Sequence, residues 1–240
     1  MRERNAEVSP RLKARMAGVF YLLTFVSGGV AIFSDKLVAP GNAGATAANI
    51  LSRQQLLWLG FAAYLMVVAC YIAVTALFYE LFKPVSRSVS LVAAFISLVG
   101  CAIQASICVL LLVPLLLLGR ASYLSVFKEE QLQALAYLSL RLYGQGFDIC
   151  FVFFGFYCLL IGYLIFRSTF LPRILGPLMA LAGLGWLTFL SPSFAHSLDP
   201  YIRAPGIVGE LALTLWLLVF SVNEQRWREQ ASAAETSIHP

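Results

Sequence analysis

Long apolar runs are the feature that most restricts what this chain can fold into. Six predominantly apolar stretches occur within its 240 residues. Their bounds are 16–33, 56–82, 89–118, 147–166, 174–190 and 207–222. A helix that crosses a bilayer needs roughly 20 apolar residues, and the fifth and sixth runs are somewhat short of that. The runs therefore predict an all-α, polytopic membrane helix bundle with six transmembrane helices.

The overall composition favours hydrocarbon over water as the surroundings of this bundle. Hydrophobic residues make up 60% of the chain and charged residues 12%. Soluble domains are closer to about 45–50% apolar and about a quarter charged, and they need more polar surface than this. We therefore expect membrane lipids as partners and no nucleic acid, and we interpret the net charge of +5 as a topology signal.

The positions of the basic residues predict an orientation. With the amino terminus inside, eleven of the 17 Lys and Arg residues fall in inner segments. These are Arg2, Arg4, Arg11, Lys13, Arg15, Lys83, Arg87, Arg167, Arg173, Arg226 and Arg228. Cytoplasmic loops carry an excess of such residues, so both termini are expected in the cytoplasm.

The expected domain organisation follows from that orientation. It is a cytoplasmic tail at 1–12, a single six-helix transmembrane domain at 13–222 and a cytoplasmic tail at 223–240. The first run could alternatively be a cleaved signal peptide, which would leave five spans. Its length favours a retained helix.

Polar residues inside the apolar runs are the candidates for function, because a charge at the bilayer centre costs about 2.5–3.5 kcal/mol or more. Glu210 is the strongest, since it precedes Val222 by 12 residues, or roughly 18 Å of helix. Gln104 is expected at the same height, with Tyr64 and Thr188 at comparable depth. These four residues either line a polar cavity in the outer half of the bundle or form packing hydrogen bonds between helices.

Charged residues nearer the boundaries have a weaker case. Asp148 precedes Arg167 by 19 residues, or roughly 28 Å, which is the outer edge of a bilayer. We therefore expect Asp148 and Arg141 to face headgroups and water. Glu210 should be either neutral or paired with a cation, for which Arg203 and Arg141 are the candidates.

A second charge cluster is expected at the inner boundary. Glu80 lies close to the inner end of the second run. Lys83, Arg87 and Arg173 are near it in the expected topology. We interpret this set as interfacial.

Residues typical of metal or cofactor chemistry are sparse. The five cysteines all lie in apolar runs, where Cys commonly serves as a small buried hydrophobe. His196 and His239 are the two histidines, and both lie outside the runs. No zinc, haem or iron–sulfur ligand pattern, phosphate-binding loop or hydrolase motif is visible. We predict no metal and no cofactor, and an enzyme is the least favoured class.

Four stretches together resemble a known family. They are "RMAGVFYLLTFVSGGVA", "ALFYELFKPVSRSVSLVAAFISLVG", "FFGFYCLLIGYLIFRSTFLPRILGPLMALAGLGWL" and "GELALTLWLLVFSVN". They are similar to bacterial integral membrane proteins catalogued as domain of unknown function 4386, over about Arg15 to Asn223. The turn at 171–173 and the helix led by Glu210 are the more specific parts. The resemblance implies about six spans, a bacterial inner membrane as the location and no assigned activity, and its pattern includes Glu210 but not Asp148.

Two classes of function remain open from the sequence. The first is binding or transport of a small amphiphile or ion through an outer-leaflet polar cavity, with a homodimer expected because six spans are few for a transporter. The second is a non-catalytic membrane subunit that stabilises or regulates a partner membrane protein.

Overall fold

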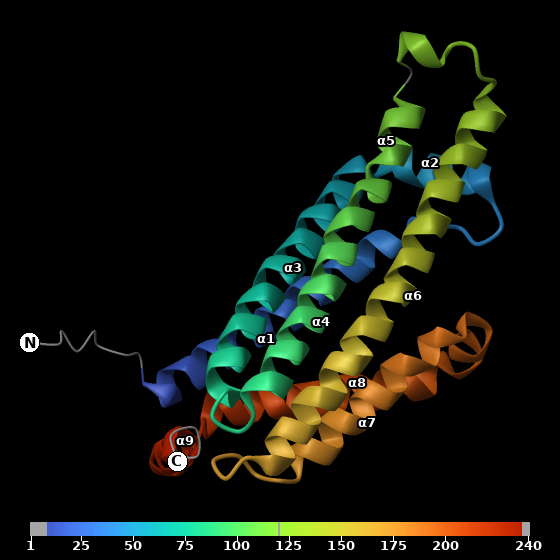
Figure 1. Ribbon diagram of the computed structural model, residues 1–240. Coiled ribbons are helices and arrows are strands. Elements are labelled where there is room, and N and C mark those ends of the chain that lie inside the picture. Colours follow the sequence, from blue (N-terminus) through green and yellow to red (C-terminus); the bar gives the residue numbers. More distant parts are fainter. Residues whose placement is uncertain (1–8, 120, 237–240) are drawn as a thin grey trace, which may run out of the picture. The chain divides into compact units, whose positions relative to one another are not determined.

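The computed structural model describes residues 9–119 and 121–236, without the side chains at 192–196, 198–200, 202, 203 and 235. Every regular element in this part of the chain is helical, which confirms the all-α prediction (Figure 1). The α-helices are α1 (Pro10–Asp35), α2 (Ala43–Ser52), α3 (Gln54–Phe82), α4 (Arg87–Ile107), α5 (Val113–Leu118), α6 (Glu129–Arg167), α7 (Leu175–Leu187), α8 (Pro192–Val219) and α9 (Glu224–Thr236). The short 3₁₀ elements are η1 (Cys108–Leu111), η2 (Ser122–Leu124) and η3 (Thr188–Leu190).

Four helical segments among the described residues are long and apolar enough to cross a membrane. They are α1, α3, the joined segment Arg87–Leu118 and α6. A fifth is added if Ala204–Val219 and Glu224–Ala234, which are bent by 104°, count as one span. The segment Leu175–Leu190 is apolar but shorter. The structure thus gives four to five candidate spans where the sequence predicted six, and the shortfall falls on the two short runs.

The outward faces of these helices are rich in large apolar side chains. Exposed examples are Val26 in α1, Met66 in α3, Phe95 in α4, Phe166 in α6 and Leu215 in α8. Soluble monomers rarely expose contiguous apolar patches of more than a few hundred Å². Apolar outward faces on several long helices indicate a multi-pass membrane protein.

The internal contacts group the residues into two compact units. Unit 1 comprises Met1–Leu22, Tyr71–Gly100 and Phe151–Pro240, and unit 2 comprises Leu23–Cys70 and Cys101–Cys150. The buried core of unit 2 includes Ala31, Leu37, Ile50, Leu57, Ala63, Tyr64, Cys108, Leu111, Leu140 and Tyr143. Large side chains buried in unit 1 include Tyr21, Phe78, Phe82, Tyr157, Ile161 and Met179.

Glycines bring α6 and α7 into backbone contact within unit 1. A Cβ atom added to Gly162 would lie 2.7 Å from the carbonyl oxygen of Gly176. One added to Gly183 would lie 2.7 Å from the carbonyl oxygen of Gly155. Small residues allow this close approach between helices, which in lipid have little hydrophobic drive to associate.

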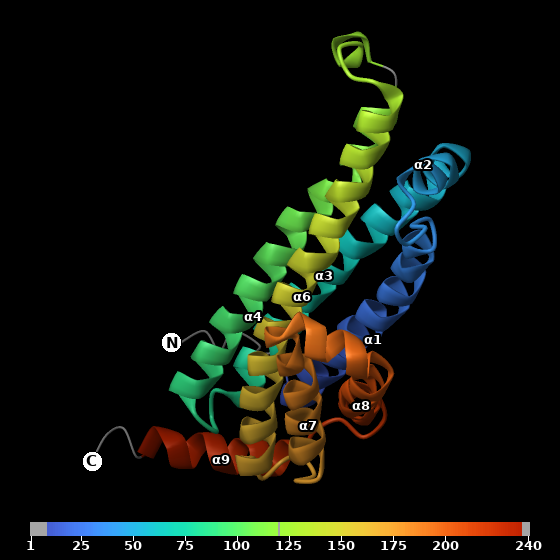
Figure 2. The same ribbon diagram turned by 90° about the vertical axis from the view of Figure 1, so that its right-hand side faces the viewer.

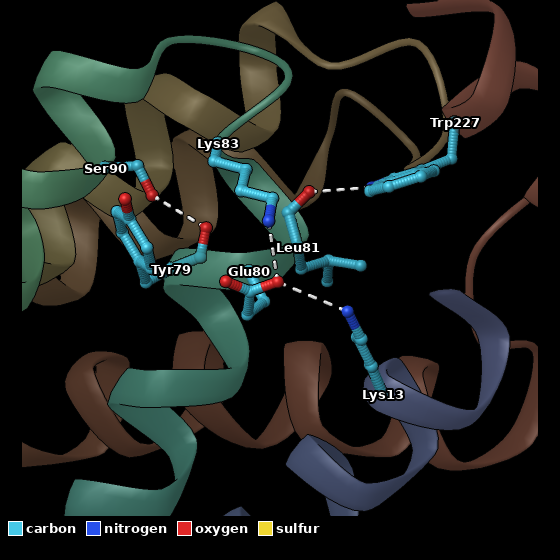
Figure 3. Close-up of polar contacts among 7 residues, drawn as sticks. All are labelled: Lys13, Tyr79, Glu80, Leu81, Lys83, Ser90 and Trp227. Atoms are coloured by element: carbon cyan, nitrogen blue, oxygen red, sulfur yellow. Dashed lines mark hydrogen bonds and ion pairs between the residues drawn. The ribbon is translucent and has the colours of Figure 1, made fainter. Parts of the chain in front are cut away.

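The acidic residue at the end of α3 is held by two lysines. The Oε2 atom of Glu80 lies 3.2 Å from Nζ of Lys13 and 2.8 Å from Nζ of Lys83 (Figure 3). Of the three cations expected near Glu80, only Lys83 pairs with it, whereas Arg87 and Arg173 are exposed. The second partner, Lys13, comes from α1. It could not be predicted from the sequence, because sequence order does not show that α1 packs against α3 in unit 1.

Helix α9, which is also part of unit 1, is bonded to the end of α3 that carries Glu80. The indole N–H of Trp227 donates to the carbonyl oxygen of Leu81 at 2.8 Å (Figure 3). The amide of Asn223 donates to the carbonyl oxygen of Phe170 at 3.1 Å. Figure 2 shows α9 leaving α8 at a sharp turn. The segment expected as a tail from residue 223 is therefore helical over Glu224–Thr236.

Candidate functional site

Glu210 of α8 meets side chains from three other helices of unit 1. The phenol O–H of Tyr21 in α1 donates to Oε2 at 2.8 Å, and the indole N–H of Trp186 in α7 donates to Oε1 at 2.7 Å. The thiol of Cys158 in α6 lies 3.8 Å from Oε1. Glu210 is only 8% exposed. Its carboxyl group is therefore a buried polar centre at which α1, α6, α7 and α8 meet.

Glycines in α8 explain how the indole reaches this carboxyl. Helices α7 and α8 pack along each other (Figure 1). A Cβ atom on Gly206 would lie 2.7 Å from the ring of Trp186, and one on Gly209 would lie 2.5 Å from a backbone carbonyl of α7. The ring of Phe151 stacks on Trp186 with a centroid distance of 4.7 Å and an interplanar angle of 7°. The indole is held between these surfaces with its N–H on the carboxyl.

Aromatic packing fixes the other strong donor. The ring of Tyr21 is fully buried and contacts Tyr71 and Phe78 edge-on, at centroid distances of 5.7 Å and 6.1 Å. Tyr71 in turn lies 5.9 Å from the ring of Tyr157. The phenol of Tyr21 therefore has little freedom to turn away from Glu210.

The donors around Glu210 are all uncharged. Among the side chains that the structure describes, no Lys, Arg or His forms an ion pair with this carboxyl. Each carboxyl oxygen instead accepts a hydrogen bond from a neutral ring donor. Hydrogen bonds from neutral donors stabilise a carboxylate but do not neutralise it, so its charge can still be neutralised by a proton or a cation.

The other predicted binding residues do not join this cluster. Gln104 and Tyr64 are buried in unit 2, where the Tyr64 hydroxyl donates to Oδ2 of Asp35 at 3.3 Å. Thr188 belongs to unit 1, but its hydroxyl donates to the carbonyl oxygen of Gly185 at 2.7 Å. Of the four predicted binding residues, Glu210 and Thr188 thus belong to unit 1 and Gln104 and Tyr64 to unit 2.

The predicted charge partners also have other surroundings. Arg141 is exposed and forms no ion pair with a described residue, and the side chain of Arg203 lies outside the described part of the chain. Asp148 was expected to face water, but it is buried, with 8% exposure. The reason is that α6 continues for 39 residues from Glu129, so Asp148 lies at its middle and packs within unit 2.

Sequence reasoning missed the three donors to Glu210. Tyr21, Cys158 and Trp186 are ordinary residues of apolar helices, and no spacing rule connects them to a residue in α8. The one usable signal was that a buried Trp or Tyr needs a partner for its polar atom. No group of three or more His, Cys, Asp or Glu residues in the described part of the chain is arranged to hold a metal ion.

The long helices with apolar outward faces indicate a multi-pass membrane protein. The chain belongs to the family described as Domain of unknown function (DUF4386), whose profile matches residues 16–220 and so includes Glu210 and its three donors. It is also similar to a protein of Archaeoglobus fulgidus described as an uncharacterized protein, with 22% identity over 163 residues, 64% of this chain and 78% of the relative. No solved structure matches the chain.

Proposed function

We propose that this protein binds or transports a small amphiphile or ion, and that Glu210 is the group that takes up a proton or a small cation during that activity. The observation that carries the proposal is a buried carboxyl that is surrounded by neutral donors instead of a counter-charge. A carboxyl within a membrane span is costly, and such residues commonly mark ion or proton pathways.

The hydrogen bonds at Glu210 supply a way to connect its charge to helix packing. As a carboxylate it accepts from Tyr21 and Trp186, which come from α1 and α7. Protonation adds an O–H donor to one oxygen and leaves that oxygen a weaker acceptor. The phenol of Tyr21 can then act as the acceptor, but the indole of Trp186 cannot, since it has only a donor. Protonation of Glu210 therefore reverses its hydrogen bond to Tyr21 or weakens its bond to Trp186, depending on which oxygen carries the proton.

A second candidate function is that of a non-catalytic membrane subunit in which Glu210 only joins helices. The observation in its favour is that both carboxyl oxygens already have donors within the chain. Interhelical hydrogen bonds in membrane helix bundles stabilise the fold by about 0.6 kcal/mol each on average. In this case the exposed apolar faces of the helices would contact a partner membrane protein or a second copy.

Modification with a carbodiimide separates the two candidates, because carbodiimides react with protonated carboxyl groups in apolar surroundings. We expect dicyclohexylcarbodiimide to modify Glu210 in the folded protein, with less modification as the pH rises and the carboxyl ionises. Peptide mass spectrometry locates the adduct. Glu210→Gln should abolish it, whereas Glu129→Gln, at the exposed start of α6, should leave it unchanged. A folded protein that is not modified at Glu210 at any pH would favour the packing role.

We also propose a topology of six spans with both termini in the cytoplasm. The basic residues of the predicted inner segments support this orientation. Single-cysteine labelling in a variant that lacks the native cysteines tests it. An impermeant maleimide added to intact cells should label a cysteine placed at Ser125, but should label one at Ser86 or Ser232 only after the cells are opened. Labelling at Ser232 in intact cells would contradict this topology.

A further inference from the structure

A groove of about 500 Å³ lies at the turn between α8 and α9 in unit 1. Two arginines, Arg11 and Arg226, line it together with the aromatic side chains of Phe170, Trp216 and Phe220. A neighbouring hollow of about 720 Å³ continues along α9 and shares the side chain of Arg226. The groove therefore combines basic groups with an apolar wall.

Hydrogen bonds hold together the chain segments that form the groove. The hydroxyl of Ser221 donates to the carbonyl oxygen of Arg11 at 2.9 Å, which joins the start of α1 to the end of α8. Ser221 itself has a φ of 61°, a left-handed conformation that ends α8. The Nη1 atom of Arg226 lies 3.5 Å from the carbonyl oxygen of Thr169. The backbone of Arg11 in α1 and the guanidinium of Arg226 in α9 are thus each bonded to a neighbouring segment of unit 1.

The charge of the groove is not balanced from within the described chain. Neither Arg11 nor Arg226 forms an ion pair with a described carboxylate. The acidic residue that lines the groove, Glu224, is paired with Arg228 at 2.7 Å. The groove consequently offers two guanidinium groups to an anion. Arginine suits phosphate because its planar donors can form two parallel hydrogen bonds to it.

The apolar side of the groove points to the source of that phosphate. The rings of Trp216 and Phe220 lie 4.4 Å apart, and Phe220 and Val219 are exposed on the outward face of α8. A free phosphate has no use for such a wall, but an acyl chain has. We propose that this groove binds an anionic phospholipid of the surrounding leaflet, with its headgroup phosphate at Arg11 and Arg226 and its acyl chain along Trp216 and Phe220.

Titration of the full-length protein in detergent with phosphatidylglycerol, followed by native mass spectrometry, tests this site. We expect a bound lipid that phosphatidylcholine does not replace. The double variant Arg11→Gln, Arg226→Gln should bind phosphatidylglycerol about tenfold more weakly or worse, since basic residues attract anionic lipids. The control Arg15→Gln, Arg87→Gln removes the same charge from exposed positions outside the groove and should bind normally.

Three results would overturn the proposal. These are an equal loss in the control variant, equal binding of phosphatidylcholine, and displacement of the lipid by excess inorganic phosphate, which would identify a free anion as the ligand. A measurement on the unaltered protein covers the case in which the double variant does not fold. Phosphatidylglycerol with a photoreactive group next to its headgroup should crosslink to the segment 216–226. Crosslinks spread evenly over the chain would exclude a specific groove.

Discussion

Replacing Glu210 with Ala is expected to be the most destabilising change of a polar side chain in unit 1. The substitution leaves the O–H of Tyr21 and the N–H of Trp186 buried without their acceptor. Interhelical hydrogen bonds in membrane bundles are worth about 0.6 kcal/mol on average and up to about 1.7 kcal/mol, so we expect the loss of two to lower the free energy of unfolding by about 1–3 kcal/mol. Equilibrium unfolding in mixed micelles, followed by tryptophan fluorescence, would measure the loss.

Variants of the donors show whether the carboxyl is the centre of this network. Tyr21→Phe and Trp186→Phe each remove one donor and leave the other bond in place, so each should cost less than Glu210→Ala. Glu80→Ala is the matched acidic control, since Glu80 is about one-third exposed and such surface ion pairs are worth about 0–1 kcal/mol. If Glu210→Ala were no more destabilising than Glu80→Ala, the hydrogen bonds at Glu210 would not contribute to the stability of unit 1.

Alanine at either of two glycines between α6 and α7 is expected to have the second large effect. At Gly162 and at Gly183 the added methyl would lie 2.7 Å from a carbonyl oxygen of the opposing helix and 2.9 Å from a backbone nitrogen. Backbone atoms cannot rotate away as a side chain can, so the two helices must separate. Overpacking typically costs about 1–3 kcal/mol, and we expect each variant to lose that much in the same unfolding measurement.

The matched control lies on the same helix. A Cβ atom on Gly144 of α6 meets nothing within 4 Å. Glycine within a helix is about 0.5–1 kcal/mol less favourable than alanine, so Gly144→Ala should be neutral or stabilising. A similar loss at Gly144 and Gly162 would show that close contact between α6 and α7 does not account for the effect.

The apolar runs were enough to predict where the long helices lie. In hydrocarbon every backbone N–H and C=O must be satisfied within the chain, so a long apolar run has few alternatives to a helix. The predicted runs 16–33 and 56–82 accordingly fall inside α1 and α3. The run 147–166 occupies only the second half of α6, because that helix already begins at Glu129 and continues into the run without a break.

Glu210 could also be selected from the sequence, whereas its environment could not. A carboxyl inside an apolar run is anomalous because of its cost in the bilayer, and this cost is a property of the residue and its neighbours along the chain. The partners are different, since Tyr21 precedes Glu210 by 189 residues. The same sequence argument suggested Gln104, which the structure places in unit 2.

The sequence by itself determined that this is a helical membrane protein of its family with a carboxyl, Glu210, inside an apolar run, because helix formation in lipid and the cost of a charge in the bilayer are local properties. Only the tertiary structure decided that neutral donors surround Glu210, that Lys13 reaches Glu80 and that Arg11 and Arg226 line one groove at the turn between α8 and α9. These facts depend on which helix faces pack together. That packing is set by small residues and aromatic rings whose contacts are distant in sequence and carry no periodic signal of their own.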